Sequence, residues 1–153
     1  MDKRLLLTHL FNGVILIRFA ISKLMAWPIS VAAFIEMAKP LGIDPTFFRI
    51  STGILVSVVI ALYFSCVVLL IKKSLLQHPK ARAWGIFSNL VGIGFSLGAL
   101  FSEFFLREAP KVPLVIIASV IILFSIFNVR VLWSAQTQRA LSEGRDTMPG
   151  GCV

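Results

Sequence analysis

Residues 47–71 read FFRISTGILVSVVIALYFSCVVLLI, a run in which Arg49 is the only charged residue. A helix of about 20 apolar residues is long enough to cross the hydrocarbon core of a bilayer. Three other segments have comparable length and apolar content, namely residues 5–27, 83–101 and 112–133. The sequence therefore predicts an all-α membrane protein that forms a bundle of four transmembrane helices.

The composition of the whole chain agrees with residence in a lipid bilayer. Of its 153 residues, 58% are hydrophobic and 14% are charged, whereas soluble domains average about 45–50% and about 25%. A soluble protein of this length has too much surface to bury that excess of apolar side chains. In a soluble protein, a net charge of +8 would suggest that the protein binds nucleic acid. Here the basic residues cluster near the span ends, so we expect a lipid bilayer as the partner and no nucleic acid.

The basic residues also predict how the chain is oriented. The connection between the second and third spans is basic and contains no acid, whereas the next connection balances basic and acidic residues. The positive-inside rule places the basic connection, and with it both termini, in the cytoplasm. We expect a multi-pass protein with a transmembrane domain at residues 1–134 and a fraying cytoplasmic tail at residues 135–153. The basic connection holds Lys72, Lys73, His78, Lys80 and Arg82.

The connection between the first two spans, residues 28–46, is largely apolar but is interrupted by Ser30, Glu36 and Lys39. Such a mixture is typical of a helix that lies in the headgroup layer. Proline disfavours helical backbone at the residue before it, so Pro40 is expected to end this segment. The sequence predicts a short interfacial helix between helices 1 and 2, beginning near Ser30.

Small residues recur every four positions on two of the predicted helices. In lipid, such stripes let helix backbones approach closely. Two interpretations remain open, packing within one chain or a face for a homo-oligomer. The stripes are Gly53, Ser57, Ala61 and Ser65 on the second span, and two on the third span, Ser88, Gly92 and Ser96 beside Gly94, Gly98 and Ser102.

Polar residues inside the predicted spans are the main candidates for ligand or partner binding, because an unpaired polar group in hydrocarbon is costly. We expect an outer ion pair between Lys23 and Glu103. We also expect an inner polar cluster in the cytoplasmic half, whose asparagines could equally serve as hydrogen-bonding links between helices. Its members are His9, Asn12, Asn89 and Asn128.

Arg18 points about 180° away from His9 on the helical wheel, so it does not face this cluster. Its Cα lies about 13 Å below the outer boundary if Trp27 marks that boundary. Four partners remain open for the guanidinium: Glu36 of the interfacial helix, a second subunit, an anionic ligand, or lipid headgroups reached by snorkelling.

Catalytic motifs are missing from the sequence. It contains no HExxH, GxSxG or P-loop pattern, and its only histidines are His9 and His78. We therefore expect no catalysis by the chain alone. Two hypotheses from other classes are a small-solute or anion transporter that uses Arg18 or Lys23, and a membrane enzyme with Cys66 as its nucleophile.

Residues 12–24, NGVILIRFAISKL, resemble the first helix of the DoxX-like family, in which a Gly lies ten residues before a Lys in a small-x-Ser-Lys-Leu ending. Residues 32–43, AAFIEMAKPLGI, look like that family's amphipathic segment, and Gly53 opens a small-residue second span as in the family. Lys23 matches the family's lysine position. The chain departs from the family's usual residues at His9, Arg18 and Arg49.

The resemblance implies a four-helix protein of the bacterial inner membrane, often a small subunit associated with membrane redox or sulfur-oxidation enzymes. Together with the polar residues in the spans, it leads us to expect an accessory subunit of a membrane redox system, with a redox partner subunit, or a protein that binds an apolar molecule such as a quinone.

Overall fold

The computed structural model describes residues 3–146, with side chains through residue 135 and at Thr137. Cys152 and the end of the predicted tail lie outside the described residues. Each of the four long helices is long and apolar enough to cross a membrane, the last of them over Val112–Ala135. The predicted all-α, four-span fold is therefore confirmed. The long helices are α1 (Lys3–Leu24), α3 (Pro45–Ile71), α5 (Pro79–Phe105) and α6 (Val112–Asp146).

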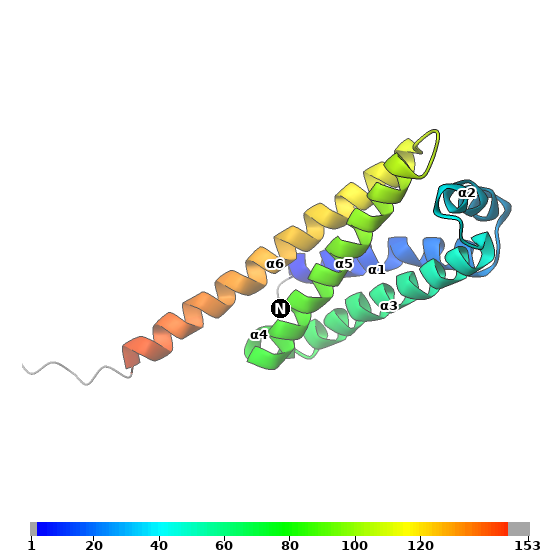
Figure 1. Ribbon diagram of the computed structural model, residues 1–153. Coiled ribbons are helices and arrows are strands. Elements are labelled where there is room, and N and C mark those ends of the chain that lie inside the picture. Colours follow the sequence, from blue (N-terminus) through cyan, green and yellow to red (C-terminus); the bar gives the residue numbers. More distant parts are fainter. Residues whose placement is uncertain (1–2, 147–153) are drawn as a thin grey trace, which may run out of the picture.

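The long helices form two antiparallel hairpins, α1 with α3 and α5 with α6. Figure 1 shows that the hairpins meet near the N-terminus and diverge toward the end where α2 (Pro28–Ala38) lies. We call these the N-terminal end and the α2 end. The short connecting elements are η1 (Lys39–Leu41), which follows α2, and α4 (Ser74–Gln77), which lies between α3 and α5.

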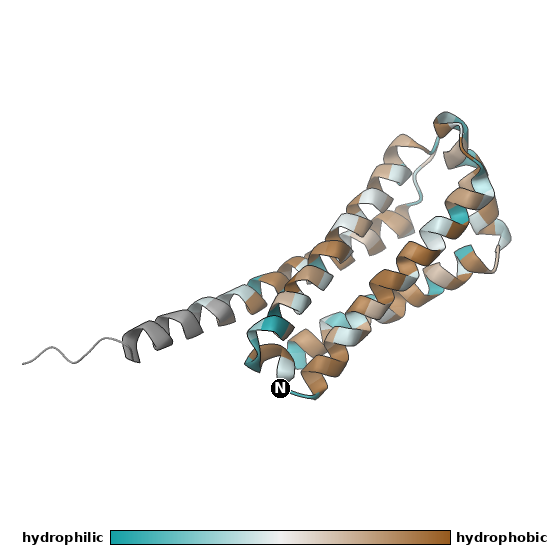
Figure 2. Ribbon diagram, turned by 60° about the horizontal axis from the view of Figure 1, so that its bottom comes forward, coloured by the Kyte–Doolittle hydropathy of each residue, from teal (hydrophilic) through white to brown (hydrophobic). Residues whose placement is uncertain are grey.

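Hydrophobic residues run along all four long helices (Figure 2), and their side chains are found both in the buried core and on the exposed surface of the bundle. Many large apolar side chains are exposed, among them Ile54, Leu90 and Leu123, each more than half exposed. In water such a surface would be unfavourable, whereas in a bilayer it contacts acyl chains. The buried core in the middle of the bundle contains Leu16, Ala20, Val56, Val59, Tyr63 and Ile121.

The connection from α1 to α3 begins and ends at residues suited to helix termini. Helix α1 ends at Leu24, because Ala26 adopts a left-handed backbone with φ of 51°. Helix α2 begins two residues before the predicted Ser30, with Pro28 in its first turn, where the fixed φ of proline is favourable. The Asp44 carboxylate caps α3 by accepting a hydrogen bond from the N–H of Phe47, at 2.6 Å.

The structure extends α5 and α6 by several residues beyond their predicted limits, whereas α1 and α3 begin only two residues early. Helix α5 spans Pro79–Phe105 rather than residues 83–101. Helix α6 continues to Asp146 and projects past the rest of the bundle (Figure 1). Residues 135–146, which belong to the predicted tail, continue α6 as helix, because the polar sequence there still favours helix and contains no proline before residue 149. The fraying of the tail stays a prediction.

Candidate functional site

A buried polar cluster joins all four long helices in the N-terminal half of the bundle. Asparagine and histidine side chains that the sequence places at similar depth are fully buried and in contact there, so the predicted convergence is confirmed. We call this group the inner cluster; it comprises Thr8, His9 and Asn12 of α1, Tyr63 of α3, Asn89 of α5, and Ser125 and Asn128 of α6.

Asn89 is the centre of the inner cluster. Its Nδ2 donates to His9 Nε2 at 3.0 Å and to the carbonyl of Gly85 at 2.8 Å. Its Oδ1 accepts from Asn128 Nδ2 at 3.0 Å. The hydroxyl of Thr8 in turn donates to Asn128 Oδ1 at 2.6 Å. One amide thus connects three of the four long helices.

Tyr63 brings the fourth helix into the inner cluster. Its hydroxyl lies 2.7 Å from Ser125 Oγ, which also accepts from Asn12 Nδ2 at 3.3 Å. Gly92 makes room for this ring, because a Cβ at that position would lie 1.9 Å from the Tyr63 hydroxyl oxygen. Asn12 Oδ1 is buried and has no hydrogen-bond partner among the described groups.

The inner cluster is a structural link rather than an open site. Its side chains form hydrogen bonds mainly with one another across helix interfaces. These bonds satisfy polar groups that would have no partner in lipid. Cys66, the nucleophile of the enzyme hypothesis, is likewise fully buried. Within residues 3–146, no three His, Cys, Asp or Glu side chains are grouped as metal ligands.

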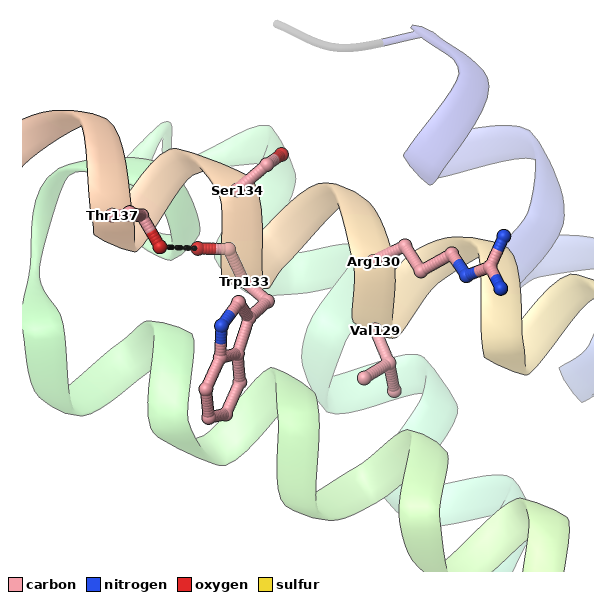
Figure 3. Close-up of a pocket in the computed structure, with 5 residues that line it drawn as sticks. All are labelled: Val129, Arg130, Trp133, Ser134 and Thr137. Atoms are coloured by element: carbon pink, nitrogen blue, oxygen red, sulfur yellow. Dashed lines mark hydrogen bonds between the residues drawn. The ribbon is translucent and has the colours of Figure 1, made fainter.

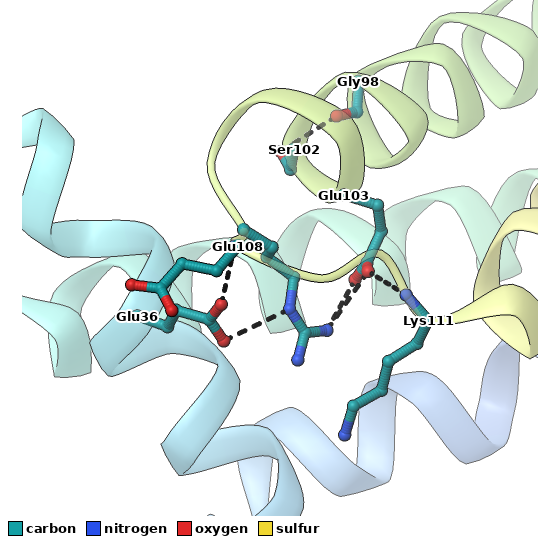
Figure 4. A network of polar contacts seen from close by, with 7 residues as sticks. Glu36, Gly98, Ser102, Glu103, Glu108 and Lys111 are labelled. Carbon is teal, nitrogen blue, oxygen red and sulfur yellow. Dashed lines mark hydrogen bonds and ion pairs between the residues drawn. The ribbon is translucent and has the colours of Figure 1, made fainter.

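A second polar group, which we call the α2-end cluster, lies at the opposite end (Figure 4). Arg107 Nη1 donates to both carboxylate oxygens of Glu103, at 3.0 and 3.1 Å, and Arg107 Nε lies 3.4 Å from Glu36 Oε2. Backbone N–H groups complete it: that of Glu108 donates to Glu36 at 2.9 Å and that of Lys111 to Glu103 at 3.1 Å. Glu36 therefore ties α2 to the connection between α5 and α6.

The predicted ion pair between Lys23 and Glu103 is wrong. Arg107, one turn further along the chain, forms a charge-assisted contact with both oxygens of Glu103 instead. Lys23 is half-buried and forms no ion pair with Glu103. The Lys23 ammonium lies 5.5 Å from the ring centre of Phe19 and 5.7 Å from that of Phe34, within the range of cation–π attraction.

Arg49 is a structural residue whose role the sequence did not reveal. Its side chain is buried on α3, and its guanidinium donates to the backbone carbonyl of Lys23. The last carbonyls of a helix have no partner within the helix, so Arg49 satisfies one at the end of α1. The only signal in the sequence was the position of Arg49, a single basic residue near the start of the second predicted span.

Arg18 lies on the exposed side of α1. Among the side chains that the structure describes, none forms a hydrogen bond or ion pair with it. The interpretation that Arg18 bonds Glu36 is wrong, because Glu36 is engaged by Arg107 and Glu108.

A hollow of about 480 Å³ lies on α6, along the residues that follow Asn128 (Figure 3). Ligand sites are usually concave and combine polar groups from several elements. This hollow is a feature of one helix surface, lined by Val129, Arg130, Trp133, Ser134 and Thr137.

Comparisons of the chain with protein-family models, with curated proteins and with solved structures find no match. The resemblance to the DoxX-like family therefore stays a prediction that rests on the sequence motifs alone. The plain conclusion from the structure is that the chain is an integral membrane protein with four apolar helices able to span a bilayer.

Proposed function

We propose that this chain is an accessory protein of a membrane redox system and that it holds an apolar molecule with a carbonyl head group, such as a quinone, beside Lys23. The chain itself performs no chemistry in this role. It positions the molecule for a redox partner subunit in the same membrane. The DoxX-like resemblance supports the bacterial inner membrane as that membrane.

The amine of Lys23 is the observation that carries the proposal. It is half-buried near the end of a span, and no carboxylate among the described side chains forms an ion pair with it. An ammonium offers three hydrogen-bond donors and no acceptor. A quinone carbonyl is an acceptor, so the two groups are complementary.

The neighbours of Lys23 suit a flat apolar head group. The rings of Phe19 on α1 and Phe34 on α2 flank the amine, and aromatic side chains pack well against a second ring. Arg107 keeps Glu103 engaged, which leaves the donors of Lys23 available. Lys23 lies one residue before the end of α1, so a molecule in the outer part of the bilayer would meet it near the membrane surface.

Binding fits the bundle better than transport of a small solute or anion. The inner cluster places buried side chains in the N-terminal half that are bonded to one another and so are not free to bind a passing solute. Flux of an anion through proteoliposomes that is lost in Lys23→Met would favour transport over binding.

Fluorescence of Trp27 tests the proposal, since this residue lies four positions after Lys23 and quinones quench indole emission. Protein with Trp84→Phe and Trp133→Phe retains only Trp27 and is titrated with decylubiquinone in detergent. We expect saturable quenching that weakens about ten-fold in Lys23→Met, the effect of losing one charged hydrogen bond.

The matched control is Lys39→Met, which removes an exposed charge at the same end of the bundle and should leave the titration unchanged. Thermal melting establishes that each variant is folded. Equal quenching in Lys23→Met and in the parent would rule out Lys23 as the binding residue.

A further inference from the structure

Arg18 lies at the centre of an apolar stripe on the exposed surface of α1. At 100° per residue, the stripe falls within about 40° of one line along the helix. Its spacing of alternately four and three residues is that of a helix face that packs along a second helix. Besides Arg18, the stripe contains Leu7, Phe11, Val14 and Ile21 of α1 and continues to Met25 just after the end of the helix; all are exposed. Phe11 also packs edge-on against Phe124 of α6, so α6 borders the stripe.

The position of Arg18 within the span makes its exposure costly. It lies six residues before the end of α1 at Leu24, so its Cα is about 9 Å along the axis from that end. From Lys3, at the other end, the corresponding distance is about 22 Å. A guanidinium at this depth requires a partner or a distortion of the bilayer.

The direction of the side chain makes lipid phosphate an unfavourable partner. In a helix, the Cα–Cβ bond tilts toward the N-terminus. The side chain of Arg18 therefore leaves α1 toward the middle of the span and away from the nearer end at Leu24. To reach headgroups at that end it would have to reverse direction.

A second copy of this chain also lacks a suitable group. Three of the four spans, Lys3–Leu24, Pro45–Ile71 and Val112–Ala135, contain no Asp or Glu. The fourth, Pro79–Phe105, contains only Glu103 in its last turn, where Arg107 engages it. A two-fold symmetric contact along the stripe would also bring two Arg18 side chains together.

We infer that the α1 stripe is a docking surface for a transmembrane helix of a different membrane protein, and that this helix carries an Asp or Glu opposite Arg18. The carboxylate neutralises the guanidinium in a medium of low dielectric, and the apolar residues of the stripe pack along the partner helix. This surface is separate from the proposed quinone site, because Lys23 lies about 140° from Arg18 around α1. If the partner is the redox subunit, this contact attaches the accessory protein to it.

Synthetic membrane-spanning helices test the inference, because they can replace the partner helix in a defined bilayer. The full chain, labelled with a donor dye, is reconstituted into phosphatidylcholine vesicles with an acceptor-labelled polyleucine peptide that carries one central Glu. Matched peptides carry Gln or Leu at the same position. We expect the Glu peptide to associate about ten-fold more strongly than the Gln peptide, and Arg18→Leu to abolish this preference.

Two further variants show whether the charge itself matters. Arg18→Lys should keep most of the preference for the Glu peptide, and Arg18→Glu should reverse it in favour of a peptide with a central Arg. Lys39→Leu, which removes an exposed basic residue of η1, outside the four spans, should change nothing. Equal association of the Glu, Gln and Leu peptides would overturn the inference, as would an unchanged preference in Arg18→Leu.

A crosslinking experiment in the native membrane extends the test to the natural partner. A photoreactive residue at Val14 should give an adduct with a protein whose span contains Asp or Glu. Arg18→Glu should lose this adduct. The adduct should return when the partner's carboxylate residue is also replaced by Arg. Adducts with lipid alone or with a second copy of the chain would overturn the docking surface. They would leave the quinone proposal intact, because that proposal is judged by Trp27 fluorescence.

Discussion

His9 Nε2 on α1 lies 3.0 Å from Asn89 Nδ2 on α5 and joins the two hairpins in the N-terminal half of the bundle. His9 Nδ1 lies 2.7 Å from the carbonyl of Leu5, which can only accept, so the ring proton lies on Nδ1 and Nε2 accepts from the amide. The contact therefore requires a neutral imidazole and fixes its tautomer. It is one of three hydrogen bonds that Asn89 makes with its neighbours.

Replacement of Asn89 should destabilise the bundle more than replacement of Asn12. Asn89→Leu leaves His9 Nε2 and Asn128 Nδ2 buried without this partner, at a cost of about 2 kcal/mol. Asn12→Leu removes one long hydrogen bond, from Nδ2 to Ser125 Oγ, and the Oδ1 acceptor, which has no partner. We therefore expect the free energy of unfolding to fall by less than about 1 kcal/mol. Unfolding in mixed micelles with increasing dodecyl sulfate measures both, and a larger loss for Asn12→Leu would contradict the assignment of Asn89 as the centre.

Gly92 and Gly98 should respond in opposite ways to the same added methyl group. Gly92→Ala places a Cβ against the Tyr63 hydroxyl, whereas a Cβ at Gly98 meets nothing within 4 Å. We expect Gly92→Ala to cost about 1–3 kcal/mol through overpacking and Gly98→Ala to be neutral or slightly stabilising in the helix. Thermal melting in detergent makes the comparison. Partial recovery of stability in the double variant Gly92→Ala, Tyr63→Phe would attribute the loss to the hydroxyl.

Glu36 should hold α2 against the connection between α5 and α6. Glu36→Gln weakens the ion pair with Arg107, so we expect faster hydrogen exchange over residues 28–41 with little change in the unfolding of the whole bundle. Glu108 contributes only its backbone N–H to this contact, so Glu108→Gln should leave the exchange unchanged. Identical exchange in Glu36→Gln and in the parent would show that α2 is held by apolar packing alone.

Arg49 should stabilise the end of α1 through its bond to the carbonyl of Lys23. Arg49→Met removes the donor but keeps most of the apolar stem, and we expect a loss of about 1–2 kcal/mol measured by the same dodecyl sulfate titration. Arg49→Lys retains a donor and should lose less. If Arg49→Met unfolds like the parent, the bond contributes nothing to stability.

The orientation inferred from charge can be measured with single cysteines. In a background of Cys66→Ala and Cys152→Ser, Lys111→Cys should react with an impermeant maleimide added outside intact cells. Lys80→Cys should react only after permeabilisation, since the positive-inside rule places that basic connection in the cytoplasm. The reverse labelling would place both termini outside.

Sequence periodicity and depth along the spans predicted four members of the inner cluster but missed its hydroxyl groups, those of Thr8, Tyr63 and Ser125. His9, Asn89 and Asn128 lie at matching heights on long helices, and polar side chains in lipid must find one another. The same reasoning failed for Glu103, because depth alone cannot show that the chain after α5 folds back and brings Arg107 closer than Lys23. The role of Arg49 was missed for a related reason, since its partner is a backbone carbonyl that no sequence pattern marks.

The limits of the helices followed local rules only in part. Pro28 and Asp44 are ordinary signals for helix starts, and the structure places α2 and α3 accordingly. The extension of α6 to Asp146 was missed because the prediction used hydropathy, which ends at the membrane surface, whereas helical backbone does not.

Mass spectrometry of the intact protein, released from mild detergent after purification from its own membrane, tests the proposed binding of an apolar molecule most directly. The account predicts an adduct with the mass of an isoprenoid quinone that is retained in Lys39→Met and lost in Lys23→Met. An adduct of equal abundance in both variants would contradict it, and so would the absence of any adduct after the parent protein is incubated with excess quinone.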